Sequence, residues 1–204
     1  MSVDEFDAIQ EEAWEEFLDQ IGSEAIDAYR LERLGAYYEE NPRVAIPAVK
    51  ALEEARKLQH AHPAAALVFA VIAIDVGFKN VLVGPIVYGM VHMEAAAGLI
   101  VNIVIQHRAL DRFKEILEHI FKDETIVEKR HSIDLLSYKR QDSNKSLWEE
   151  IKIIQSIRNN VVHKGDDVTS EEASMAIEVA TVFLYDLLKT VVNDLGCQIE
   201  LDTE

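Results

Sequence analysis

The middle of the chain is its most apolar part, and it limits what the chain can fold into. Residues 64–74 carry no charged side chain, and residues 81–91 and 95–105 continue the same character. A run of this length is well short of the roughly 20 apolar residues that a helix needs to cross a bilayer. Asp75 and Lys79 also interrupt it. We therefore predict buried core helices rather than a membrane hairpin.

The rest of the composition favours helices over strands. The 204 residues include only 8 glycines and 4 prolines, and Ala, Glu, Leu and Ile dominate. So few turn-forming residues do not suit a β-sandwich or a barrel, whereas the abundant residues are mostly good helix formers. The prediction is an all-α protein with three parts: an acidic helical extension over residues 1–60, a helical body over residues 61–195 and a C-terminal tail over residues 196–204.

The spacing of apolar residues predicts the individual helices. Two of them begin with a capping box, in which a Ser or Thr hydroxyl and a Glu three residues later each accept a bond from the other's backbone amide: Ser146 with Glu149, and Thr169 with Glu172. In chain order, the predicted helices cover about residues 4–21, 23–38, 44–59, 64–83, 87–121, 126–136, 146–164 and 169–191, and Gly84-Pro85 is predicted to break the fourth.

The net charge of −17 argues against binding of long nucleic-acid duplexes, because phosphate backbones are bound mainly by Lys and Arg. The charge is uneven: residues 108–164 carry 12 basic and 10 acidic side chains, a sum of +2, while residues 1–63 and 165–204 each sum to −9. A short RNA segment remains compatible with this distribution. Cys197 is the one cysteine and residues 1–5 lack the features of a secretory signal, so we predict a cytoplasmic protein.

The most reactive set of side chains follows the apolar stripe of the helix predicted from Ser146. Arg158 supplies a permanent, planar charge that suits a phosphate or the charge of a phosphorane-like transition state. His163 supplies an imidazole, the side chain suited to take a proton from a ribose 2′-hydroxyl or to give one to a leaving oxygen. Together they can act on a phosphodiester without a metal or another cofactor.

Helical geometry separates these two side chains. Positions five apart lie about 140° apart around an ideal helix, so we expect His163 to lie where the helix unwinds toward Gly165. Gln155, Asn159 and His163 are four apart and share one face. One copy of the site has a single His, whereas acid and base catalysis is easier with two, so pairing of two copies in a homodimer is predicted.

The run Arg158-Asn159-Asn160-Val161-Val162-His163, placed before a capped helix, resembles the Arg-Asn-x-x-x-His signature of the HEPN superfamily of all-helical domains. The likeness is firmest over residues 146–190 and looser over residues 64–121. It implies an up-and-down bundle of four or more helices, a homodimer and metal-independent cleavage of single-stranded RNA that leaves a cyclic phosphate. Residues 1–60 lie outside the resemblance and form the predicted N-terminal helical extension of this bundle. Members of this superfamily serve in toxin–antitoxin, phage-defence and RNA-processing systems, so an antitoxin or another regulatory protein is a further expected partner.

The resemblance also implies roles for individual residues. Arg158 and His163 would be catalytic, and Asn159 would position the phosphate or the His. Asn160, Lys164 and Asp75 would support the site or bind substrate, and Asp75 would orient either His163 or Arg158. One superfamily variant has a Tyr two positions after the His, which a partner nucleotidyltransferase modifies. Gly165 takes that place here, so this form of neutralisation is not expected.

Structural interpretations of the same residues stay open. Arg158 is able to cap carbonyl groups at the helix C-terminus while His163 bonds locally, and Asp75 is able to pair with Lys79. His60 and His62 are interpreted as surface residues rather than metal ligands, and no metal site is predicted.

Other functions also stay open. The main alternative is a non-catalytic module for dimerisation or protein interaction, whose acidic first helices bind a basic protein. A third is a peripheral membrane protein that uses the apolar middle of the chain.

Two other Arg/His pairs of the sequence, Arg56/His62 and Arg112/His119, fit a loosened form of the Arg-to-His spacing of the signature. Neither pair has an adjacent Asn or a capped helix after it.

Overall fold

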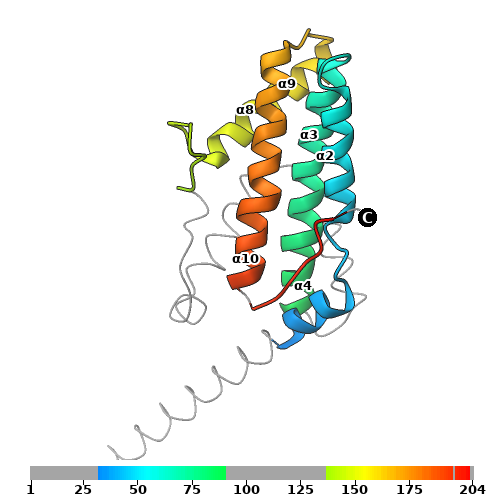
Figure 1. The fold of residues 1–204 in the computed structure, drawn as a ribbon, viewed down its shortest axis with the longest axis vertical. Helices are drawn as coiled ribbons and strands as arrows, with labels where there is room; N and C mark the ends of the chain where they lie inside the picture. Colours follow the sequence, from blue (N-terminus) through cyan, green and yellow to red (C-terminus); the bar gives the residue numbers. More distant parts are fainter. Residues whose placement is uncertain (1–31, 91–136, 195, 203–204) are drawn as a thin grey trace, which may run out of the picture.

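The computed structural model describes residues 32–90, 137–194 and 196–202 (Figure 1). The predicted helices at 4–21 and 126–136, and most of the one at 87–121, lie outside these residues. The described part is all-helical and contains no strand, as predicted from the composition. After a helical stretch over residues 32–40, the elements are α2 (Ile46–Leu58), α3 (Pro63–Gly77), the π-helix η1 (Phe78–Val83), α4 (Gly84–Met90), α8 (Leu147–Lys164), α9 (Ser170–Thr181), the π-helix η2 (Val182–Leu188) and α10 (Lys189–Asp194).

The helices α2, α3 and α9–α10 stand side by side, and α8 crosses them at an angle (Figure 1). Each helix buries the face that its apolar spacing predicts. In both α2 and α3 the buried residues recur every three or four positions. The helix α3 packs against α2, α8 and α9, so it lies at the centre of the core. The segment Pro63–Val83 is long and apolar enough to cross a membrane by length and composition alone, but 61% of it is buried within the protein. Its burial against α2, α8 and α9 favours a core helix.

The predicted break at Gly84-Pro85 was wrong, because the chain stays helical from Pro63 to Met90. The helix changes register instead of ending. The Gly84 amide donates to the Lys79 carbonyl five residues back, which is a π-type bond. A proline in a regular α-helix clashes with the carbonyl four residues earlier. The wider π turn directly before Pro85 changes that geometry, so the chain continues without a break.

Four close contacts hold the core in and next to η1. Phe78 packs against Trp148 of α8 and Phe183 of η2, with both ring centroids 6.2 Å away. The hydroxyl of the buried Tyr38 donates to the carbonyl of Val81. At Gly77 the helices approach so closely that an added Cβ would lie 2.5 Å from Leu184 Cδ2. The end of α3 is therefore held on several sides.

The predicted C-terminal tail is packed onto the bundle over residues 196–202. The Glu200 amide donates to the Pro42 carbonyl at 2.8 Å, and its carboxylate lies 3.6 Å from the Arg43 guanidinium. Leu201 is buried in the core, and its carbonyl accepts a bond from Tyr185. The tail thus joins the start of α2 to η2.

Candidate functional site

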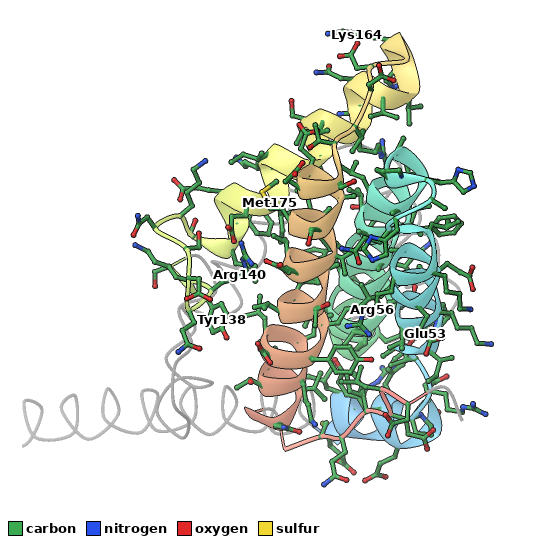
Figure 2. The ribbon with its side chains drawn as sticks, turned by 45° about the horizontal axis from the view of Figure 1, so that its top comes forward. Glu53, Arg56, Tyr138, Arg140, Lys164 and Met175 are labelled. Atoms are coloured by element: carbon green, nitrogen blue, oxygen red, sulfur yellow. The ribbon has the colours of Figure 1, made fainter. Side chains whose placement is uncertain are left out.

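The site is built on α8, and both ends of this helix are defined as the sequence predicts. Ser146 and Glu149 form the capping box at its start. At its end Gly165 has a positive φ of 73°, a left-handed conformation that glycine adopts without strain, and its amide donates to the Val161 carbonyl. The second capping box, at Thr169 and Glu172, starts α9 directly afterwards. Figure 2 shows α8 running obliquely from the Arg140 end to Lys164 at its far tip.

Arg158 lies in the last two turns of α8 and contacts α3 rather than the end of its own helix. Its Nη2 atom is 3.5 Å from Asp75 Oδ2, and its Nη1 atom donates to Asn159 Oδ1 at 2.9 Å. The side chain stays 33% exposed. Arg158 is thus held by Asp75 and Asn159 and is still accessible to a ligand, and these bonds do not match the interpretation that it caps helix carbonyls.

Asp75 joins the two helices. Its Oδ1 atom accepts a hydrogen bond from Gln155 Nε2 at 3.1 Å, while Oδ2 faces Arg158. Burial raises the pKa of Asp75 above its ordinary value, although the Arg158 charge and the Gln155 bond both act to lower it. The sequence suggested three partners for Asp75: Arg158, His163 and Lys79. The structure places Arg158 beside it, and among the described residues the ion pair is not with Lys79 and no bond joins Asp75 to His163.

His163 lies in the last regular turn of α8 and is exposed, as is Lys164, while Asn160 is half-buried. The expectation that His163 sits in an unwound segment was wrong, because the αL turn begins only at Gly165. Within the described residues, no hydrogen bond or ion pair joins His163 to Arg158 or to Asp75. A single chain therefore brings Asp75, Asn159 and Arg158 together and leaves His163 separate from them.

Two further features lie at the end of α8, one within the motif and one directly after it. Val162, which lies four residues after Arg158 on the same face of α8, is 56% exposed and is the one large hydrophobic residue exposed in the described part of the chain. Asp166 and Asp167 follow Lys164 and are exposed as well, so the tip of the bundle carries both signs of charge.

Sequence reasoning missed two groups. Gln155 was placed on the face of Asn159 and His163 but was given no role, and its partner Asp75 is 80 residues away in the chain. Arg140 lies between the helices predicted at 126–136 and 146–164 and has no predicted role, yet it binds Glu150 through two hydrogen bonds of 2.9 Å and Glu178 through one of 2.7 Å. Pairs of this kind form when segments far apart in the sequence pack together, so the spacing of residues along the chain does not predict them.

No group of three or more possible metal ligands occurs among the residues that the structure describes. His60 and His62 are exposed in the connection between α2 and α3. Comparison with protein families, with curated proteins and with solved structures finds no match to this chain.

Proposed function

We propose that this protein is a metal-independent endoribonuclease of the HEPN type that cleaves single-stranded RNA as a homodimer. One observation carries the proposal: a restrained but accessible Arg158 lies beside Asn159, on the turn of α8 that precedes the exposed His163. Along the sequence, the charge of +2 over residues 108–164 suits a short anionic substrate better than a long one.

The proposed reaction breaks one phosphorus–oxygen bond and forms another. A His163 imidazole accepts the proton of a ribose 2′-hydroxyl, whose oxygen then attacks the adjacent phosphorus. Arg158 stabilises the negative charge that develops on the phosphoryl oxygens. The 5′-oxygen leaves with a proton donated by a second imidazole, that of His163 from the second copy, and a 2′,3′-cyclic phosphate remains.

The test is cleavage of single-stranded RNA by the pure protein in the presence of a chelator. We expect His163→Ala and Arg158→Ala each to lower the rate by roughly 100-fold or more, since loss of a general acid–base or of a charge-stabilising group has effects of this order. The matched control is Arg56→Ala/His62→Ala, which removes a pair of similar spacing in α2 and the following connection and should leave the rate unchanged.

Folding and self-association are measured for every variant by circular dichroism and sedimentation. Equal rates for the wild type, both single variants and the control would refute the proposal. So would a wild-type protein that does not cleave RNA. The exposed Val162 within the motif would then favour the second candidate, a module for dimerisation or protein interaction.

A further inference from the structure

Gln155 lies on α8 and contacts Asp75, the residue of the candidate site that comes from α3. It is half-buried on α8, three residues before Arg158 and four before Asn159, so all three lie on adjacent faces of the helix. Its Nε2 atom donates to Asp75 Oδ1 at 3.1 Å, while the other oxygen of the same carboxylate lies 3.5 Å from Arg158 Nη2. A single carboxylate of α3 therefore bridges two side chains of α8.

This bridge determines which way the carboxylate turns. The terminal torsion of an aspartate is broad, so the Asp75 side chain by itself does not favour one orientation sharply. The donating amide of Gln155 holds Oδ1, and this leaves Oδ2 directed at the guanidinium. On its other side the guanidinium is held by Asn159 Oδ1 at 2.9 Å. Two of the terminal nitrogens of Arg158 are thus engaged from two directions.

We propose that Gln155 is a positioning residue of the candidate ribonuclease site: it orients the Asp75 carboxylate, and that carboxylate together with Asn159 holds Arg158 in the geometry that the phosphoryl group requires. The inference rests on the proposed function for its catalytic consequence. Its geometric part, that Gln155 restrains Arg158 through Asp75, is independent of any activity.

The hydrogen bond from Gln155 also affects when Asp75 is charged. It lowers the pKa of Asp75, as does Arg158, while burial raises it. Arg158 is the charged side chain among the described residues that acts on Asp75, and it comes from α8. Without the Gln155 bond, the carboxylate becomes protonated at a higher pH and releases Arg158 there.

The test variant is Gln155→Leu, which keeps much of the volume and removes the donor. We expect kcat for RNA cleavage to fall roughly tenfold or more with KM within about twofold, as for other losses of alignment at a reacting centre. The acidic limb of the kcat–pH profile should move to higher pH. Gln155→Leu/Asp75→Asn should be no slower than Asp75→Asn alone, since both act through one carboxylate. The matched control is Gln198→Leu, which changes an exposed glutamine of the tail and should leave kcat, KM and the pH profile as in the wild type.

A second measurement does not need cleavage. The Nη–Hη signals of Arg158, the groups that face Asp75 and Asn159, are identified in nitrogen–proton NMR spectra as those lost in Arg158→Lys, and their exchange with water is then measured. We expect exchange to be several-fold faster in Gln155→Leu and unchanged in Gln198→Leu.

The outcomes separate the two proposals. A wild type that does not cleave RNA would refute the proposed function, and the NMR result would still decide whether Gln155 restrains Arg158. Unchanged exchange would overturn the inference. A slower Gln155→Leu enzyme whose pH profile keeps its acidic limb, or whose melting temperature has dropped, would also overturn it, because that pattern indicates a merely structural role.

Discussion

The two arginine–carboxylate pairs of α8 differ in almost every respect. Near its start, Arg140 binds Glu150 in a two-pronged contact with both distances at 2.9 Å, and the two side chains are only 16% and 6% exposed. Near its end, Arg158 meets Asp75 in a single contact of 3.5 Å, with 33% and 41% exposure. Ser143 adds a third bond to Glu150, whereas Asp75 receives only one further bond, from Gln155. The first pair fastens the chain before α8 to the bundle, and the second leaves its arginine accessible.

The pKa values of the two carboxyl groups move in opposite directions. Burial alone would raise the pKa of Glu150, but bonds from Arg140 and Ser143 more than offset it, and the pKa falls below its usual value. For Asp75, burial prevails over Arg158 and Gln155, and the pKa rises. The Asp75 charge is therefore incompletely compensated. Carboxyl groups with a shifted pKa occur at functional sites and also in structural ion pairs.

The largest predicted difference between the two pairs is in stability. Arg140→Met leaves the Glu150 carboxylate buried without its partner, and this should lower the free energy of unfolding by about 3–5 kcal/mol. Arg158→Met acts on a solvent-screened pair and should cost no more than about 1 kcal/mol. Urea unfolding of both variants measures the difference. Similar losses for the two would show that the contrast in geometry has no energetic counterpart.

The pH dependence of stability sharpens the comparison at the carboxyl groups. The folded pKa of Glu150 is lowered, so its contribution is complete above the unfolded value of about 4.3 and is lost as the pH falls through the folded pKa. The folded pKa of Asp75 is raised, so the folded state gains relative stability as the pH falls through that value toward about 3.9.

Unfolding free energies of wild type, Glu150→Gln and Asp75→Asn between neutral and acidic pH measure both effects. The stability of the wild type relative to Glu150→Gln should decrease as the pH falls, and relative to Asp75→Asn it should increase. Slopes of the same sign would contradict the assignment.

The smallest predicted effect tests whether α3 itself is held firmly next to Asp75. Gly77→Ala would place a Cβ 2.5 Å from the fully buried Leu184, and the resulting overpacking costs about 1–3 kcal/mol, more than the gain of up to about 1 kcal/mol from helix propensity. Gly35→Ala meets nothing within 4 Å and should stabilise the protein by about 0.5–1 kcal/mol. Thermal unfolding of the two variants should shift in opposite directions. A stabilising Gly77→Ala would mean that α3 can shift away from Leu184. The long Arg158–Asp75 distance would then follow from the mobility of α3 rather than from the site.

Local rules predicted much of the fold correctly. The two capping boxes, the end of the helix at Gly165 and the burial of α3 depend on residues a few positions apart, and the structure has all of them. The register change at Gly84-Pro85 was not predicted, because a π turn is stabilised by packing around it rather than by its own sequence.

The candidate site was predictable only in part. The motif on α8 is continuous in sequence, so Arg158, Asn159 and His163 were identified from the run itself, the capped helix after it and its resemblance to a known signature. The bonds from Gln155 to Asp75 and from Arg140 to Glu178 join residues 80 and 38 positions apart. Such pairs depend on how helices pack, and one sequence gives no signal for them. The proposed reaction, the homodimer and the RNA substrate stay predictions.

The packing of residues 196–202 affects how this protein unfolds locally. Leu201 is buried in the core, and the Glu200 amide donates to the Pro42 carbonyl. The last part of the described chain is therefore bonded to the segment before α2. Fraying from this end cannot proceed one residue at a time, because lifting the tail uncovers the core and frees the entry to α2 at once. Hydrogen exchange at the amides of Cys197 and Glu200, both bonded to backbone carbonyls, therefore reports a shared opening of two distant stretches rather than the looseness of a terminus.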